Sequence, residues 1–200
     1  MRVAAVVLAA GAGSRFGGGK LLALLDGRPI LVHVVAAARA AGLDPIVVVV
    51  PPTGELDDTD LGDVHHITNE TPQDGLSSSV RLGLRELDGD PDVAAAVILP
   101  GDQPRVRPDV IARLLEAATT SPAPLLIAPR YEADDAPNPV FARRAAWRLA
   151  DELVGDHGFG PLLADRPDLV QRIDVTGANP DIDTRSDLAR LNRQADPDVS

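Results

Sequence analysis

A glycine-rich stretch near the start of the chain holds the residues best suited to chemistry. Five glycines lie within residues 11–19, with Arg15 among them and Lys20 directly after them. Glycine adopts positive φ angles and has no side chain, so the N–H groups of such a loop can approach an anion. Lys20 is the only lysine beside eighteen arginines, which indicates that a compact ammonium group is needed there. The pattern predicts a phosphate-binding loop.

Three interpretations of this loop compete. A Walker-type loop needs Gly, four residues and then Gly-Lys-Ser/Thr, but Ser14 stands at the first of these positions and Leu21 at the last. The dinucleotide fingerprint fits Gly11 and Gly13 but has Phe16 where glycine or alanine is needed. A glycine-rich turn without a ligand is the third interpretation.

A second candidate for chemistry is Asp102. It follows the apolar run 93–99 and lies in the turn Pro-Gly-Asp-Gln-Pro at 100–104. A carboxylate fixed at the end of a buried strand by glycine and proline is an oxygen ligand suited to Mg²⁺. The alternative is a turn aspartate that bonds its own backbone.

Two further carboxylates, Asp181 and Asp183, are one residue apart. On an extended segment they point the same way, so both could face one metal site. Alternatively, Asp183 or Thr184 caps the helix that follows, with Asp187 in its first turn. The residues alone do not choose between the two carboxylates.

The periodicity of apolar residues predicts the elements that position these side chains. Short apolar runs predict strands at 3–8, 46–50, 64–68, 93–99, 125–128 and 169–175. Helical spacing predicts helices at 29–41, 77–87, 108–118, 141–153, 161–164 and 184–192. This alternation is typical of an α/β protein, a three-layer α/β/α Rossmann-like fold with a mostly parallel sheet. Ligands of such sheets bind beyond the carboxyl ends of the strands.

We expect one domain over residues 1–194 and a polar tail at 195–200, with a solvated loop or a short irregular helix at 54–63. A net charge of −11 argues against nucleic acid as a partner. The longest apolar run, 46–52, is far shorter than the roughly twenty residues of a membrane-spanning helix. The absence of cysteine excludes disulfides and thiolate metal sites. A cytoplasmic protein is the expectation.

The residues Leu8-Ala9-Ala10-Gly11-x-Gly13-x-Arg15-Phe16-Gly17, followed by Lys20-Leu21-Leu22, resemble the signature loop of the MobA-like nucleotidyltransferases. Within that family the loop is most similar to that of the molybdenum cofactor cytidylyltransferases, because guanylyl-transferring relatives have glycine where this chain has Ala10. The resemblance extends through separated motifs to Leu188. It implies Mg²⁺-dependent transfer of CMP from CTP to the terminal phosphate of molybdopterin, with release of pyrophosphate.

The resemblance also implies roles for individual residues. Arg15, Lys20 and Asp102 would be catalytic, and Asp102, Asp181 and Asp183 would contact the metal. The nucleotide would be held by Leu8, Ala9, Ala10, Gly11, Gly13, Asn69, Gly75, Ser77 and Ser78. The acceptor side would comprise Gln103, Pro104, Asn138, Pro139 and Asp156. A molybdoenzyme or its chaperone would be a further partner.

The chain departs from the family pattern on the acceptor side. Pro137 precedes Asn138 where relatives often have glycine, and Phe159-Gly160 replaces a usual Ala-Arg. The acceptor is therefore open, and so is guanylyl or uridylyl transfer to another small phosphate. Two other functions remain as alternatives: an NAD(P)H-dependent oxidoreductase on the same fold, and a non-catalytic carrier of the cofactor.

Overall fold

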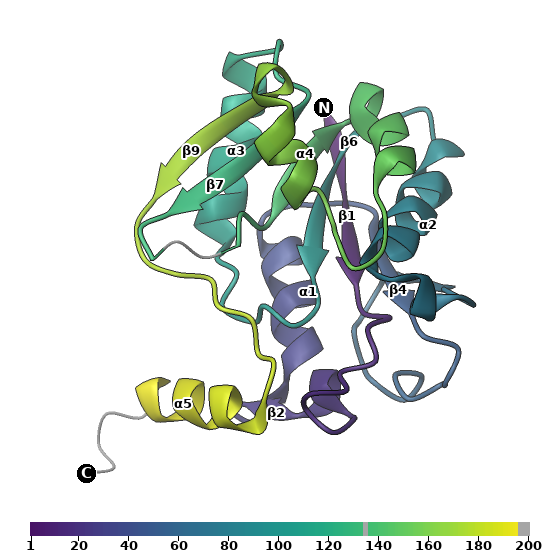
Figure 1. Cartoon of the computed structure of the whole chain (residues 1–200), viewed down its shortest axis with the longest axis vertical. Coiled ribbons are helices and arrows are strands. Elements are labelled where there is room, and N and C mark those ends of the chain that lie inside the picture. Colours follow the sequence, from purple (N-terminus) through teal and green to yellow (C-terminus); the bar gives the residue numbers. More distant parts are fainter. Residues whose placement is uncertain (134–135, 196–200) are drawn as a thin grey trace.

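The computed structural model of the protein describes residues 1–133 and 136–195 (Figure 1). Its strands are β1 (Arg2–Leu8), β2 (Leu24–Leu25), β3 (Arg28–Pro29), β4 (Ile46–Val50), β5 (His65–Thr68), β6 (Val93–Pro100), β7 (Leu126–Tyr131), β8 (Val140–Arg143) and β9 (Val170–Val175). Its α-helices are α1 (Ile30–Ala40), α2 (Leu76–Asp88), α3 (Pro108–Thr120), α4 (Gly160–Asp165) and α5 (Arg185–Ala195). Short 3₁₀-helices are η1 (Lys20–Leu22), η2 (Pro72–Asp74), η3 (Arg144–Glu152) and η4 (Pro167–Leu169).

Seven of these strands form one sheet in the order β5-β4-β1-β6-β8-β7-β9. The central strand β1 pairs in parallel with β4 and with β6, so that Val7 lies opposite Val48 on one side and Leu99 on the other. Strand β8 runs antiparallel to both β6 and β7. The carboxyl ends of β1, β4 and β6 therefore meet at one edge of the sheet, where ligands bind in such folds.

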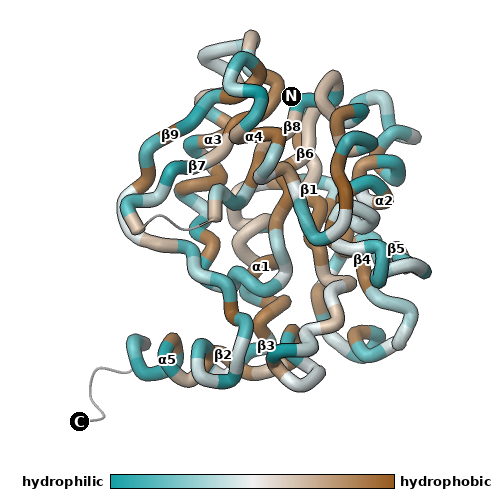
Figure 2. The backbone as a smooth tube through the Cα atoms, viewed as in Figure 1, coloured by the Kyte–Doolittle hydropathy of each residue, from teal (hydrophilic) through white to brown (hydrophobic). Residues whose placement is uncertain are grey.

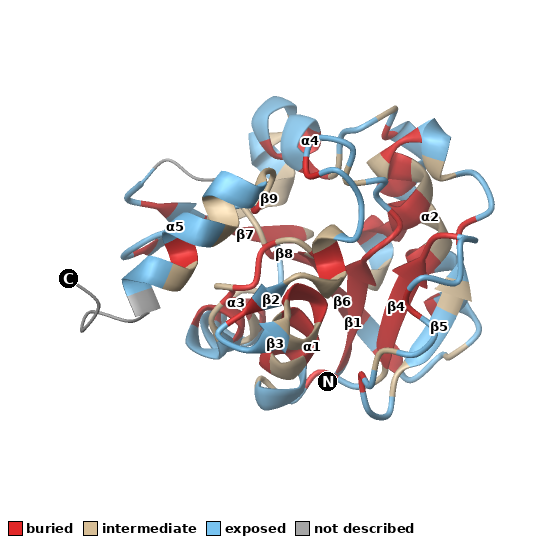
Figure 3. Ribbon diagram, turned by 90° about the horizontal axis from the view of Figure 1, so that it is seen from below, coloured by how far each residue is buried: buried red, intermediate tan, exposed pale blue. Residues whose placement is uncertain are grey.

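Helices cover both faces of the sheet and give three layers. Residues Ala5 and Val7 of β1 belong to a core shared with α1, α3 and α5. Residues Val6 and Leu8 belong to a second core shared with α2, η3 and α4. Apolar and buried residues are accordingly concentrated in the strands between the helices (Figures 2 and 3). The predicted three-layer α/β/α fold with a mostly parallel sheet is confirmed.

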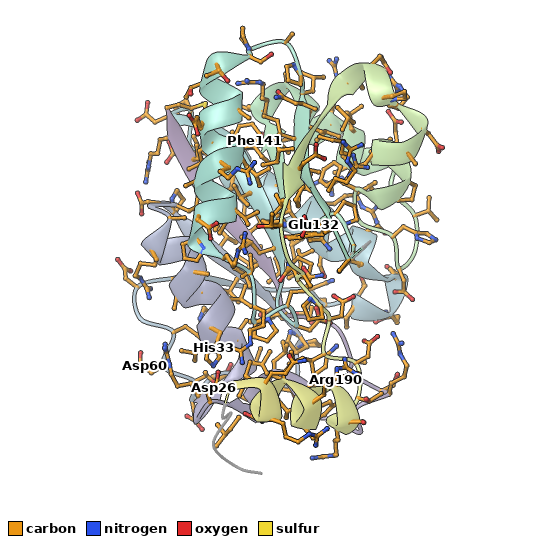
Figure 4. All side chains as sticks on the ribbon, turned by 90° about the vertical axis from the view of Figure 1, so that its left-hand side faces the viewer. Asp26, His33, Asp60, Glu132, Phe141 and Arg190 are labelled. Atoms are coloured by element: carbon orange, nitrogen blue, oxygen red, sulfur yellow. The ribbon has the colours of Figure 1, made fainter. Side chains whose placement is uncertain are left out.

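The prediction of a helix over 141–153 is wrong for its first residues. Val140–Arg143 is strand β8, and the helix that follows, Arg144–Glu152, is 3₁₀. Phe141 is fully buried between β6 and β7, opposite Val97 and Ile127 (Figure 4). The apolar residues of β8 fit the helical period that follows, but the gap between two other strands decides their conformation.

A hairpin of β2 and β3 was not predicted. Its turn is Asp26-Gly27, with positive φ at both residues, and Asp-Gly between apolar residues is a strong hairpin signal. The hairpin contacts the last helix: Asp26 N–H donates to Asn192 Oδ1 at 3.0 Å, and Asn192 Nδ2 donates to the carbonyl of Leu24 at 3.3 Å. Figure 4 shows Asp26 beside α5.

Residues 54–63, all of them described, form turns without helix or strand. The predicted loop is anchored, however, because Leu56 and Leu61 are buried in the core under α1. Of the predicted tail, residue 195 ends α5, and 196–200 lie outside the described residues. Over 1–133 and 136–195, each helix is too short or too polar to cross a membrane.

Candidate active site

The glycine-rich loop leaves β1 at the carboxyl edge of the sheet. Gly13, Gly17, Gly18 and Gly19 all have positive φ, which explains the concentration of glycine. The carbonyl of Gly13 accepts the N–H groups of Phe16 and Gly17 at 3.0 and 3.2 Å, so the loop is folded onto itself. It ends in η1, whose first residue is Lys20.

A cavity of about 330 Å³ lies between this loop and the start of α2. Its size falls within the range of small-ligand sites. It is lined by Leu8, Ala10, Gly11, Ala12, Gly13, Ser14, Pro72, Gln73, Gly75, Leu76, Ser79 and Asp156. Of the residues predicted to hold the nucleotide, Leu8, Ala10, Gly11, Gly13 and Gly75 line the cavity. Ala9 instead packs into the core, and its N–H donates to the carbonyl of Val49 at 2.8 Å.

Of the polar residues predicted to hold the nucleotide, Asn69 and Ser77 are buried and Ser78 is half-buried. Asn69 is 4% exposed, and its Nδ2 donates to the hydroxyls of Ser78 and Ser79 at 2.8 and 2.9 Å. Its Oδ1 accepts the N–H of Thr71 at 3.0 Å. Ser77 is fully buried. These contacts join the end of β5 to the start of α2. Of the three serines at 77–79, Ser79 lines the cavity, whereas the two named as nucleotide-binding, Ser77 and Ser78, do not.

Lys20 lies between two carboxylates from distant parts of the chain. Its Nζ is 2.6 Å from Asp102 Oδ2 and 3.8 Å from Asp183 Oδ1. Its side chain is 13% exposed and packs against Gly13, where an added Cβ would lie 3.3 Å from Lys20 Cβ. The loop cation and the turn carboxylate that the sequence singled out are thus in direct contact. Lys20 lies next to Gly13 of the cavity wall, but the predicted catalytic and metal-binding residues Arg15, Lys20, Asp102 and Asp183 do not themselves line the cavity.

Asp183 also contacts the second cation of the loop. Its Oδ2 is 2.9 Å from Arg15 Nη1, and the Arg15 side chain is 74% exposed. An exposed guanidinium held by a single ion pair is weakly fixed.

A backbone hydrogen bond brings the carboxylates together. The N–H of Ile182 donates to the carbonyl of Asp102 at 3.0 Å, and the Ile182 side chain is buried in the core. This brings the segment of Asp181 and Asp183 to the Asp102 turn. In Figure 1 the yellow segment before α5 and the purple loop after β1 both lie below the sheet.

Asp181 differs from Asp183 in its surroundings. Its Oδ1 accepts a hydrogen bond from Gln103 Nε2 at 2.6 Å, and Gln103 Oε1 accepts one from Asn179 Nδ2 at 3.0 Å. Burial raises the pKa of the Asp181 carboxyl, the nearby Asp102 raises it further, and the bond from Gln103 opposes this. Gln103 was predicted at the acceptor side, but it is 1% exposed and holds this network.

Asp183 is positioned by the first turn of α5. Asp187 Oδ2 accepts the N–H and the hydroxyl of Thr184, both at 2.8 Å, while Thr184 Oγ1 accepts the N–H of Asp187 at 3.2 Å. These bonds form a capping box and lower the pKa of Asp187. The capping alternative is thus realised by Thr184 and Asp187, which leaves Asp183 free for the site.

The carboxylates of this site suit a metal ion only if a bound substrate supplies further oxygen ligands. Among the described residues, no group of three or more His, Cys, Asp or Glu is arranged to hold an ion. Asp102 and Asp183 converge on one point, the ammonium of Lys20. Mg²⁺ is commonly bound by one or two carboxylates, with substrate phosphates and water completing its shell. Asp102 and Asp183 fit that pattern.

A second cavity, of about 160 Å³, adjoins the first and shares Leu8, Leu76 and Asp156 with it. Its other lining residues are Ile98, Pro100, Ala136, Pro137, Asn138, Val140, His157, Gly158, Phe159, Gly160 and Pro161. Asn138 and Asp156 were predicted on the acceptor side and lie here. Pro104 and Pro139 do not line the cavity. Its wall contains no lysine or arginine.

Gly75 lines the first cavity and provides a test of the packing beside it. Its φ is 89° and its ψ −178°, a region that is essentially open to glycine alone. A Cβ there would lie 2.3 Å from the carbonyl carbon of Gly155. We expect Gly75→Ala to lower the free energy of unfolding by about 2–3 kcal/mol, measured by urea denaturation.

Gly89→Ala is the matched control for this substitution. Gly89 has φ −68°, and an added Cβ would have its nearest neighbour at 3.9 Å. We expect this variant to keep the stability of the parent protein within about 0.5 kcal/mol. Equal stability of the two variants would contradict the close contact between the start of α2 and residues 155–156.

Comparisons with known proteins agree with this geometry. Residues 5–171 match the family model described as the MobA-like NTP transferase domain. The chain is 38% identical over 127 residues to 2-C-methyl-D-erythritol 4-phosphate cytidylyltransferase of Cereibacter sphaeroides, over 61% of this chain and 56% of that protein. The chain thus spans about half the length of this relative.

Solved structures resemble almost the whole chain. The crystal structure of Rv0371c from Mycobacterium tuberculosis H37Rv is 26% identical with a TM-score of 0.82, and covers 96% of this chain and 98% of that one. A complex of Rv0371c with manganese is also 26% identical, with a TM-score of 0.79 and coverage of 96% and 99%. The similarity therefore includes the segment before α5, which lies beyond residue 171.

Proposed function

The chain belongs to the MobA-like NTP transferase domain family, and on this premise we propose that it transfers CMP from CTP to a phosphorylated small molecule. The observation that carries the proposal is the position of Lys20, which reaches both Asp102 and Asp183 and packs against Gly13, a residue of the cavity wall. Cations and acidic metal ligands at one edge of a nucleotide-sized cavity are what transfer from a triphosphate requires.

We propose that the residues of the chain divide the work as follows. Backbone N–H groups of the loop and the ammonium of Lys20 bind the β- and γ-phosphates. Arg15 leaves Asp183 and adds its charge to the same phosphates. Asp102 and Asp183 would hold the divalent ion, Mg²⁺ in the simplest case, and this ion would neutralise charge that develops on the phosphates.

In the proposed reaction, an oxygen of the acceptor phosphate attacks the α-phosphorus of CTP. A new P–O bond forms there as the bond to the β-phosphate breaks, and pyrophosphate leaves with the electron pair. Little covalent help from the protein is needed, because positioning and charge stabilisation lower the barrier. The shared wall of Leu8, Leu76 and Asp156 would place acceptor and nucleotide side by side.

The preference for CTP is tested by direct comparison with GTP. Ala10 lines the cavity, and the family resemblance links alanine here to cytidine. We expect the purified protein with Mg²⁺ to bind CTP at least tenfold more tightly than GTP in isothermal titration. Equal affinity, or a preference for GTP, would contradict the assignment.

For the acceptor we propose molybdopterin, which the motifs of the sequence favour. The second candidate is a phosphorylated polyol, because the name of the cytidylyltransferase relative gives 2-C-methyl-D-erythritol 4-phosphate. The small volume of the second cavity also favours this smaller acceptor. The deciding experiment measures pyrophosphate release from CTP with each acceptor in turn.

Release of pyrophosphate with either acceptor would exclude a non-catalytic carrier. An oxidoreductase would instead consume NAD(P)H without pyrophosphate. If molybdopterin is the acceptor, a molybdoenzyme or its chaperone is the proposed recipient of the product.

A further inference from the structure

A third cavity, of about 380 Å³, lies between α2 and η3, and its wall shares no residue with the two cavities of the candidate active site. Its charged residues come from both elements: Arg81, Arg85 and Asp88 from α2, and Arg144, Arg148 and Asp151 from η3. Leu84 and Trp147 contribute apolar surface. Four guanidinium groups thus face two carboxylates, in a chain whose net charge is −11.

Sequence spacing explains the arrangement. Arg81 and Arg85 are four residues apart on α2 and therefore lie on one face of the helix. The adjoining face of α2 holds Val80, Leu84 and Leu87 in the core against the sheet, and Leu84 also lines the cavity. Helix α2 and η3 pack side by side in the same core, so the arginines on their outer sides line one cavity.

The four arginines differ in how many of their donors are bonded within the protein. The guanidinium of Arg144 donates to the carbonyls of Asp88, Asp90 and Val93 and stacks on Trp147 at 4.9 Å. Arg85 pairs with Asp151 at 3.2 Å, but both side chains are more than half exposed, so the pair is weak.

The other two arginines have donors to spare. Arg81 uses one, from Nη1 to the carbonyl of Leu153 at 2.7 Å. Arg148 is exposed and, within the part of the chain that the structure describes, has no hydrogen-bond or ion-pair partner. Guanidinium groups bind phosphate oxygens in a bidentate way. An open cavity with several such forks and an apolar floor is chemically matched to a phosphate group on a small organic molecule.

We propose that the cavity between α2 and η3 is a binding site for a small phosphate-bearing anion, held by Arg81, Arg85 and Arg148. The site is connected to the candidate active site. The carbonyl of Leu153 accepts a hydrogen bond from Arg81, and two residues later the carbonyl of Gly155 accepts the N–H of Ser77 at 3.0 Å. Asp156 then lines both active-site cavities. An anion that fixes Arg81 would therefore alter the affinity for the nucleotide, a consequence that rests on the proposed function.

The test is a titration of the full chain with inorganic phosphate in isothermal calorimetry, with ionic strength held constant by sodium chloride. We expect saturable binding that weakens about tenfold in Arg148→Ala, through loss of a charge-assisted hydrogen bond. Arg193→Ala is the matched control, because Arg193 is exposed on α5 and its loss changes the net charge equally. Lys20→Ala should retain the binding, since it affects only the active site.

Absence of saturable binding, or equal affinity in Arg148→Ala and Arg193→Ala, would overturn the proposed site. Binding lost in Lys20→Ala alone would assign phosphate to the active site and overturn it as well. A second titration measures the Kd of CTP with and without inorganic phosphate. We expect at least a twofold change in the parent protein and none in Arg148→Ala; an unchanged Kd in the parent would overturn the connection while leaving the transferase proposal intact.

Discussion

Replacement of Lys20 by alanine is expected to lower kcat/KM for CTP about 10³-fold. The ammonium is the least exposed cation of the site and is within 4 Å of two carboxylates. Its loss removes positive charge from the phosphates and leaves Asp102 and Asp183 to repel them. Positioned cations in phosphoryl transfer contribute roughly 10³–10⁵ in rate. Pyrophosphate release under CTP-limiting conditions measures the effect.

Two further variants control for charge and shape. Arg193→Ala, which removes an exposed cation far from the site, should keep the rate of the parent protein. Lys20→Arg restores the charge but not the compact ammonium, and we expect it to recover only part of the loss. A Lys20→Ala enzyme with near-normal kcat/KM and an unchanged circular dichroism spectrum would refute the proposed arrangement of the site.

Asp102→Asn is expected to abolish metal-dependent turnover to a similar degree, about 10³-fold. The substitution keeps the size of the side chain and the backbone carbonyl that accepts the N–H of Ile182, so the fold should persist. It removes one of the two carboxylates that converge on Lys20. Titration with Mn²⁺, followed by electron paramagnetic resonance, should show weaker metal binding independently of turnover.

The same measurements choose between Asp181 and Asp183. Asp183 faces Lys20 and Arg15, whereas Asp181 is tied to Gln103. Asp183→Asn should therefore weaken Mn²⁺ binding strongly and Asp181→Asn only slightly. The reverse order would assign the metal to Asp181 and would mean that the Gln103 bond breaks when the ion binds.

The sequence predicted the parts of the site that depend on local pattern. Lys20 and Asp102 each follow an apolar strand by a glycine-containing turn, and parallel strands bring such turns to one edge. Their contact at 2.6 Å follows from that rule. The position of Asp183 was predicted only as one of two, because alternation places both carboxylates on one side and says nothing of their partners.

Other features depend on contacts that leave no pattern in the sequence. Gln103 meets Asn179 and Asp181 across more than 70 residues, and no spacing predicts such a network. Residues 141–143 of strand β8 were predicted as helix, because nothing in their local spacing shows that they pair with β6 and β7. The Asp26-Gly27 hairpin, in contrast, carried a turn signal that predicts it, so it could have been found.

The bond from Ile182 to Asp102 has a consequence for how the protein becomes active during synthesis. Most strands of the sheet are synthesised once β8 is complete, yet the segment whose Ile182 bonds to Asp102 comes about eighty positions after it. That segment lies past the stretch that matches the family model. Under the proposed function, a nascent chain that stops short of it would have the glycine-rich loop and Asp102 but would lack Asp183, the second carboxylate of the proposed metal site.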